Sequence, residues 1–201
     1  MKKVEPIRDR ELLDRCFAIA KKHDRDRRKT DVLSWELLLV VGFNTSLRIS
    51  DLVTFKVKDL RGQKYVRLEA QKTGKDTRIL INPEARKEID RILGTRDGED
   101  WALRGRQKDK YSGQPKAISR QRAWQIMNKI ARKAGIEDRI GCHTLRKTFG
   151  YHYYRLTGDV VSLQRILGHD NRRDTLVYIG IIQDEIDESL KKFSLVPTSL
   201  T

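Results

Sequence analysis

Six side chains in the sequence could hold a phosphate, move a proton or act as a nucleophile. In chain order they are Arg48, Lys72, His143, Arg146, His169 and Tyr178. A guanidinium offers two parallel donors to phosphate oxygens, and an imidazole titrates near neutral pH. A phenol is a rare but known covalent nucleophile, and nearby cations stabilise its phenolate. Together these groups suit a site that moves a proton while it holds a phosphate.

Each candidate also has a local context that could position it. Arg48 follows a turn at the end of an apolar helix, and Asp51 three residues later could orient it. His143 and Arg146 are three residues apart, which places them on one helical face. Lys72 lies at the tip of an expected hairpin. Taken alone, each has an ordinary reading as a surface cation, a packed histidine or a solvated turn lysine.

The elements that must position these residues are mainly helical. Hydrophobic periodicity predicts helices over residues 11–22, 34–43, 49–55, 83–93, 119–134, 143–156, 159–167 and 183–193. Two strands are expected at 65–70 and 78–81, joined by a turn at 71–77. The polar stretch 94–116 is expected to be irregular, with a brief strand at 101–103, and Asp174 to cap a short turn that carries Tyr178. The expected fold class is mainly α with a small antiparallel β-sheet (α+β).

The composition points to a polyanionic partner. The chain has 201 residues, with 43 Lys and Arg against 28 Asp and Glu, a net charge of +15. Cations that dock on DNA release condensed counterions, so DNA is the commonest reason for such an excess. The alternatives at this point are a basic but inert surface and an RNA or ribosome partner.

Several classes of protein are disfavoured by what the sequence lacks. Cys16 and Cys142 are far apart, which argues against a disulfide framework or a zinc site. No apolar run approaches the roughly 20 residues of a membrane span. The first residues have no hydrophobic region after their lysines and do not form a signal peptide. We therefore expect a soluble, reduced, cytoplasmic protein with no membrane partner.

As an ordered set, the six residues resemble the catalytic domain of the tyrosine recombinases, the phage integrase family. The matching segments are Leu47-Arg48-Ile49-Ser50-Asp51-Leu52, Lys72-Thr73-Gly74-Lys75, His143-Thr144-Leu145-Arg146, Leu167-Gly168-His169 and Tyr178. The resemblance covers residues 5–193. The sequence departs from the family at Ser46, where glycine is frequent, at Asp170-Asn171, where two serines are frequent, and at Gly180, where histidine is frequent.

The resemblance implies a fold and a chemistry. The fold would be the tyrosine recombinase catalytic domain, of the DNA breaking-rejoining type, over residues 1–195, with a frayed end at 196–201. Tyr178 would attack a DNA phosphodiester to give a 3′-phosphotyrosine, with neither ATP nor a metal cofactor. Arg48 and Arg146 would hold the phosphate oxygens, and Lys72 would protonate the leaving 5′ oxygen. His143 would shuttle the proton of Tyr178, and His169 would donate a hydrogen bond to the phosphate.

The resemblance also implies partners. These are double-stranded DNA and further copies of the chain in a DNA-bound tetramer, with accessory DNA-bending proteins as an additional class. The tail helix at 183–193 would dock on a neighbouring copy, and the alternative is that its apolar stripe folds back on its own domain. The chain looks like a short stand-alone recombinase, and the other reading is a piece of a longer integrase.

Some alternatives remain open on the sequence. Lys75 could replace Lys72, whereas Tyr151, Tyr153 and Tyr154 are rejected as nucleophiles because they crowd one helix beside His143. The rival functions are a non-catalytic DNA-binding regulator derived from a recombinase, a type IB topoisomerase and a basic RNA-binding domain. The Leu-Gly-His segment favours a recombinase over a topoisomerase.

Overall fold

A computed structural model describes residues 4–26, 33–68 and 77–191 of the chain. Its elements in order are α1 (Arg10–Asp26), α2 (Trp35–Asn44), α3 (Ile49–Leu52), the 3₁₀ turn η1 (Val57–Asp59), β1 (Tyr65–Leu68), β2 (Thr77–Leu80), α4 (Pro83–Leu93), β3 (Arg104–Lys108), β4 (Pro115–Ala117), α5 (Arg120–Ala134), α6 (Thr144–Thr157), α7 (Val160–Leu167), α8 (Arg172–Ile179) and α9 (Ile181–Lys191). The fold is mainly α with small antiparallel sheets, which confirms the expected class.

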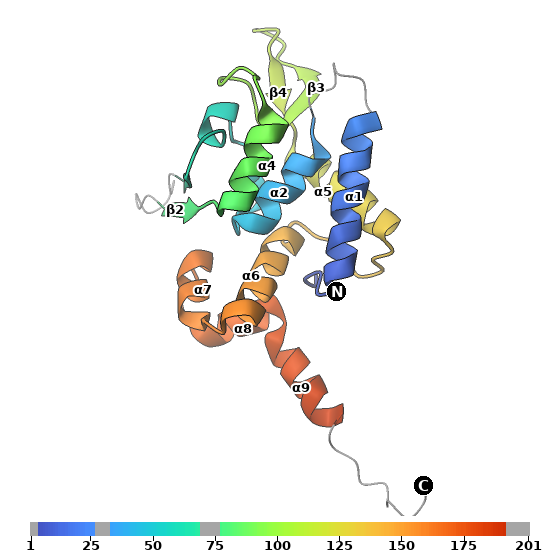
Figure 1. The fold of residues 1–201 in the computed structure, drawn as a ribbon, viewed down its shortest axis with the longest axis vertical. Helices are drawn as coiled ribbons and strands as arrows, with labels where there is room; N and C mark the ends of the chain where they lie inside the picture. The colour runs from blue at the N-terminus through green and yellow to red at the C-terminus, as the bar shows by residue number, and fades with distance from the viewer. Residues whose placement is uncertain (1–3, 27–32, 69–76, 192–201) are drawn as a thin grey trace, which may run out of the picture.

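Helix α2 forms the centre of the main core. The run from Leu37 to Val41 is apolar on every face, and all five of its residues are buried. A helix of this kind must be covered on all sides. Helices α1, α4 and α6 pack on α2, and α5 packs on α1 (Figure 1). The end of α2 is thereby fixed where it leads into the segment that carries Arg48.

A second, smaller core joins helices α6 to α9 at the lower end of the molecule (Figure 1). It is built from Leu163, Leu167, Ile179 and Ile181. Gly150 on α6 permits the close approach, because a Cβ there would lie 2.7 Å from a methyl carbon of Ile179. This packing holds α8, the helix that contains Tyr178, directly against α6.

The segment 4–9, called here the N-terminal strap, lies across α6 and reaches α9. The backbone N–H of Ile7 donates to Thr148 at 3.0 Å, and Lys147 donates to the carbonyl of Val4 at 2.9 Å. Arg8 forms an ion pair with Asp184 of α9 at 3.1 Å. The strap therefore ties this early segment to α6 and α9, two of the helices that pack against α8.

Within the part of the chain that the structure describes, the strands form two separate two-stranded antiparallel sheets, not one. Strands β1 and β2 pair from Tyr65–Leu80 to Leu68–Thr77, as expected from the sequence. Strands β3 and β4 were not expected, because 94–116 was predicted to be irregular. The β3 strand Arg104–Lys108 is polar throughout and lacks the apolar alternation that marks a strand. Its hairpin turn is instead held by Asp109, which accepts from Tyr111 and Ser112 at 3.0 Å.

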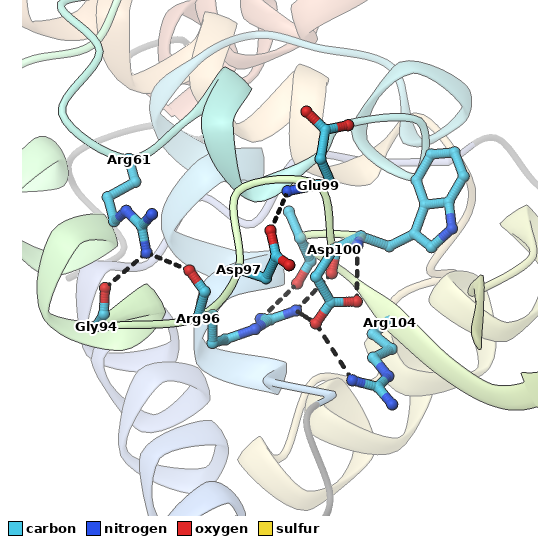
Figure 2. A network of polar contacts seen from close by, with 9 residues as sticks. Arg61, Gly94, Arg96, Asp97, Glu99, Asp100 and Arg104 are labelled. Atoms are coloured by element: carbon cyan, nitrogen blue, oxygen red, sulfur yellow. Dashed lines mark hydrogen bonds and ion pairs between the residues drawn. The ribbon is translucent and has the colours of Figure 1, made fainter. Parts of the chain in front are cut away.

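The brief strand predicted at 101–103 is also wrong. Figure 2 shows that this stretch is held by side chains: Arg96 donates to the carbonyl of Ala102 at 3.1 Å and pairs with Asp100 at 3.1 Å. Arg61 donates to the carbonyl of Gly94 at 2.8 Å in the same network. Trp101 forms only an isolated bridge with Lys56. Side-chain donors, together with single backbone bonds such as that from the Ala102 N–H to the Phe55 carbonyl, hold this stretch without a regular strand ladder, and periodicity does not reveal this.

Two helix boundaries near the end of the chain differ from expectation. Asn171, not Asp174, caps α8, because its side chain accepts from the N–H of Asp174 at 2.8 Å. Helix α9 starts at Ile181, two residues early, and Phe193 lies outside the described residues. The helix projects away from the body (Figure 1), with Ile186 46% and Leu190 60% exposed. Within the described ranges, none of the helices has the length and apolar character needed to cross a membrane.

Candidate active site

Five of the six predicted residues meet where α3, α6, the end of α7 and α8 come together. His143 is at the N-cap position of α6, and Arg146 lies in the first turn of that helix. His169 directly follows Gly168, the residue that ends α7, and Tyr178 is in the last turn of α8. The charge of Arg48, at the start of α3, acts on the pKa of each of the other four. The segments are up to 130 positions apart in the sequence (Arg48 to Tyr178).

Arg146 is a buried brace that links two segments of the site. The residue is only 7% exposed, and its guanidinium donates to the carbonyl of Ser46 at 2.8 Å and to the carbonyl of Leu167. These two carbonyls belong to the segment before Arg48 and to the end of α7. One buried side chain thus sets the spacing between the parts of the chain that carry Arg48 and His169.

Ser46 has an unusual backbone conformation next to this brace. Its φ is +57°, in the left-handed region that favours glycine. It is fully buried, and its hydroxyl has no hydrogen-bond partner among the described residues. A side chain at this φ has a steric cost that glycine avoids. The carbonyl of the same residue is the acceptor for Arg146.

Tyr178 and His143 are in hydrogen-bonding contact. The phenol oxygen lies 3.2 Å from Nδ1 of His143. Partial burial of the imidazole, helped by the charges of Arg146, Arg48 and Lys147, lowers the pKa of His143 below its ordinary 6.5. The ring is therefore neutral at pH 7, so Nδ1 can accept the phenol proton when Nε2 carries the ring hydrogen. This pair has the geometry of a nucleophile with its base.

The phenol itself is half-buried. Burial raises the pKa of Tyr178 above its ordinary 10.0, and the charges of Arg146 and Arg48 act in the opposite direction. The ring of His169 stands edge-on to the phenol ring, with centroids 4.9 Å apart. The resting site therefore holds a neutral phenol surrounded by groups that stabilise a negative charge once it develops.

His169 is oriented by a residue that the sequence interpretation missed. Its Nδ1 lies 3.2 Å from the hydroxyl of Thr175, which donates its only proton to the carbonyl of Asn171 at 3.1 Å. Nδ1 is therefore the donor of the pair, and Nε2 remains available. Burial, followed by the charge of Arg146, lowers the pKa of His169. Thr175 stands three residues before Tyr178, so helical spacing could have indicated it.

Arg48 is exposed. We expected the Asp51 carboxylate to orient the Arg48 side chain, but its contact is with the Arg48 backbone. The Asp51 carboxylate accepts from the backbone N–H of Arg48 at 3.3 Å and from the Ser50 hydroxyl at 3.2 Å. Asp51 thus stabilises the first turn of α3, which sets the backbone from which the guanidinium extends.

The remaining sequence candidates are placed as follows. Lys72 and its alternative Lys75 lie outside the described residues, between strands β1 and β2. Tyr151 lies beneath Arg8, 5.5 Å from ring centroid to guanidinium carbon, and Tyr153 stacks on Phe149. Both aromatic rings therefore have packing partners in the second core.

Lys147 is a second residue that the interpretation missed. It directly follows Arg146, is 6% exposed, and holds its ammonium 4.9 Å from the centre of the Tyr178 ring. The sequence carries no signal for this role, because Lys147 stands between Arg146 and Thr148 and its burial is set by the packing of α6. Among the described residues, no group of three or more His, Cys, Asp or Glu side chains is arranged to bind a metal ion.

The sequence is similar to known proteins over most of its length. Residues 13–183 match the model of the phage integrase family. The chain is 35% identical over 190 residues to the probable integrase/recombinase YoeC of Bacillus subtilis, covering 94% of this chain and 97% of that protein. It is 30% identical over 175 residues to tyrosine recombinase XerA of Pyrococcus horikoshii, covering 85% of this chain but only 58% of the relative.

Solved structures share the fold at low sequence identity. The crystal structure of XerA recombinase aligns with a TM-score of 0.65 at 18% identity, over 94% of this chain and 64% of that one. A lambda integrase tetramer bound to a Holliday junction aligns with a TM-score of 0.61 at 17% identity, over 89% and 49%. The arrangement of α1 to α9 is thus an established architecture.

Proposed function

This chain belongs to the phage integrase family of site-specific tyrosine recombinases, and on that premise we propose that Tyr178 is its nucleophile. The observation that carries the assignment is the 3.2 Å contact between the Tyr178 hydroxyl and Nδ1 of His143. Tyr178 alone combines this contact with the charges of Arg48 and Arg146, both of which act on its pKa. A nucleophile, a base and two phosphate-binding cations are the groups that such a reaction requires.

In the cleavage step, the Tyr178 oxygen attacks the phosphorus of a DNA phosphodiester. A Tyr–O–P bond forms, the bond from phosphorus to the 5′ oxygen breaks, and the phenol proton passes to His143. Arg48 and Arg146 hold the non-bridging oxygens and stabilise the charge on the pentacoordinate phosphorus. Lys72 protonates the departing 5′ oxygen. The product is a 3′-phosphotyrosine with a free 5′-hydroxyl.

The rejoining step reverses this sequence on a partner strand. The 5′-hydroxyl returns its proton to Lys72, attacks the phosphorus and displaces Tyr178, which recovers a proton from His143. Because each step exchanges one phosphate ester bond for another, the bond energy is kept and the two steps need no external energy source. His169 donates to the phosphate through Nε2. Since Nδ1 already donates to Thr175, this requires the protonated ring, which the negative phosphate favours.

The proposed substrate is duplex DNA. A net charge of +15 on 201 residues favours binding to a phosphate backbone, with an affinity that falls steeply as salt rises. We also propose that residues 1–195 form one catalytic domain with a tail helix near its end. The proposed oligomer is a tetramer on DNA.

Helix α9 is the proposed contact between copies. It leaves the body after Gly180, is held to it by the Arg8–Asp184 ion pair, and exposes Ile186 and Leu190. Burial of apolar side chains on a projecting helix under a second surface is favourable, because it removes them from water. We propose that the surface is that of a neighbouring copy.

The experiment is a covalent trapping assay. A duplex that the protein selects from a randomised pool is nicked at successive positions in separate samples, so that cleavage close to a nick releases a short strand and cannot be reversed. Denaturing gels then show whether protein becomes attached to DNA. We expect an adduct with the natural protein and none with Tyr178→Phe.

Tyr154→Phe is the matched control, because it removes the same atom from a neighbouring helix and should leave the adduct unchanged. An adduct that persists in Tyr178→Phe would contradict the nucleophile assignment. Tight, salt-sensitive binding without an adduct from the natural protein would favour a non-catalytic DNA-binding regulator. Relaxation of supercoiled DNA without strand exchange would favour a topoisomerase.

A further inference from the structure

Lys147 is a buried cation that the proposed mechanism leaves unused. The residue is 6% exposed, and it occupies α6 between Arg146 and Thr148, both of which are also buried. An ammonium removed from water costs free energy unless polar or charged partners compensate for it. The burial of a charge therefore calls for an explanation at this position.

The contacts of the ammonium link two parts of the molecule. Nζ of Lys147 donates to the carbonyl of Val4 in the N-terminal strap at 2.9 Å. The same nitrogen lies 4.9 Å from the centre of the Tyr178 ring. The Val4 carbonyl thus holds the ammonium beside the ring, and the other strap contacts, from Ile7 to Thr148 and His152, hold the strap on α6.

A cation at this position interacts unequally with the two forms of the phenol. It attracts the neutral ring through the negative face of its π-system, at a distance within the usual limit of about 6 Å. It attracts the phenolate more strongly, because the negative charge is shared between the oxygen and the ring carbons. An interaction that strengthens as charge develops lowers the barrier of the chemical step.

We propose that Lys147 is a positioning residue for the nucleophile, which orients the Tyr178 ring and favours its phenolate during both cleavage and rejoining. The inference rests on the proposed role of Tyr178. In cleavage, the oxygen gains a bond to phosphorus as its proton leaves for His143, and Lys147 neither gains nor loses a proton. In rejoining, the Tyr–O–P bond breaks and the electron pair returns to an oxygen whose ring faces the ammonium.

The test compares four variants with the natural protein in the trapping assay at saturating DNA, so that the rate of the chemical step is measured. Lys147→Arg keeps the charge and a donor for Val4. Lys147→Gln keeps a donor and loses the charge, and Lys147→Met loses both. Lys87→Met, an exposed lysine on α4, is the matched control and should react like the natural protein. DNA affinity and Tm are measured for each.

We expect Lys147→Gln and Lys147→Met to react roughly 10- to 30-fold more slowly than the natural protein, and Lys147→Arg to react within about threefold of it. DNA affinity should change little in all of them. Natural rates in the Gln and Met variants would overturn the inference. Equal slowing in all three, with a lowered Tm, would also overturn it, because that pattern belongs to a purely structural lysine. A natural protein that forms no adduct contradicts the proposed function itself, and the inference then fails with it.

Discussion

The hydroxyl of Tyr178 lies 3.2 Å from Nδ1 of His143, across 35 positions of sequence. The contact exists because α8 packs on α6 through Gly150 and Ile179, which brings the last turn of one helix to the first turn of the other. A neutral imidazole beside a neutral phenol is a proton acceptor that is ready before DNA arrives. The properties of this pair determine how the rate of cleavage should depend on pH.

Acid should slow cleavage only below the ordinary histidine range. Burial and neighbouring cations lower the pKa of His143, so the neutral base persists as the pH falls through 6.5 and is lost at a lower pH. Protonation of His143 should therefore not lower the second-order rate constant, which reports the free enzyme, between about pH 8 and 6.5, and the loss of rate that depends on this group should appear only below that range. His143→Gln should react slowly and lose the decline. A decline centred above pH 6.5 would contradict a neutral His143 in the free enzyme.

The two arginines should differ in what they do for stability. Arg146→Lys leaves the buried carbonyls of Ser46 and Leu167 without their shared donor and should lower the free energy of unfolding by roughly 2–3 kcal/mol. Arg48→Lys changes an exposed side chain and should stay within about 0.5 kcal/mol. Both should reduce adduct formation by about a hundredfold. Urea unfolding and the trapping assay separate the two effects, and equal destabilisation would contradict the brace.

Ser46→Gly should stabilise the protein. Glycine accepts a φ of +57° without the steric cost that a side chain carries, and the change removes a buried hydroxyl that lacks a partner among the described residues. The expected gain is about 1 kcal/mol, a rise in Tm of roughly 2–4 °C for a chain of this size. Ser50→Gly, within helix α3, is the control and should lower Tm. A lower Tm for Ser46→Gly would mean that the strain is absent.

Thr175→Val should impair the reaction more than the fold. The substitution nearly preserves shape but removes the oxygen that accepts from His169, so the ring loses its fixed orientation. We expect adduct formation to fall about tenfold, with stability reduced by only about 1 kcal/mol. Thr175→Ser should restore most of the rate. Thr157→Val, which removes an equivalent hydroxyl-to-carbonyl bond on α6, is the control, and a matching loss of rate there would contradict the assignment.

The sequence predicts the helices well because their apolar faces recur with a clear period. The boundaries of α4 and α5 match the expected ones closely, through Pro83 at the start of one and Gly135 at the end of the other. The β3–β4 hairpin could not be foreseen, since its strands are polar and its turn depends on Asp109. Asn171 was overlooked as a cap because Asp174, three residues later, is an equally good capping residue by type.

The sequence proposes the members of the candidate site but not the residues that support them. Motif order identifies Arg48, His143, Arg146, His169 and Tyr178, and the structure brings these five together. The order of the motifs does not reveal that Arg146 binds two backbone carbonyls or that Lys147 faces the phenol ring. Those contacts depend on how α6 packs against segments distant in the chain. Lys72 stays a prediction, since it lies outside the described residues.

The most direct test of the central claim is to locate the DNA on the protein. The trapped adduct is digested with nuclease and trypsin, and the remaining nucleotide is mapped by mass spectrometry. The tryptic peptide of residues 174–191 contains a single tyrosine, Tyr178, and the peptide 148–155 contains Tyr151, Tyr153 and Tyr154. We predict a nucleotide on Tyr178 in the first peptide. A nucleotide on the second peptide, or on a residue that is not a tyrosine, would contradict the account.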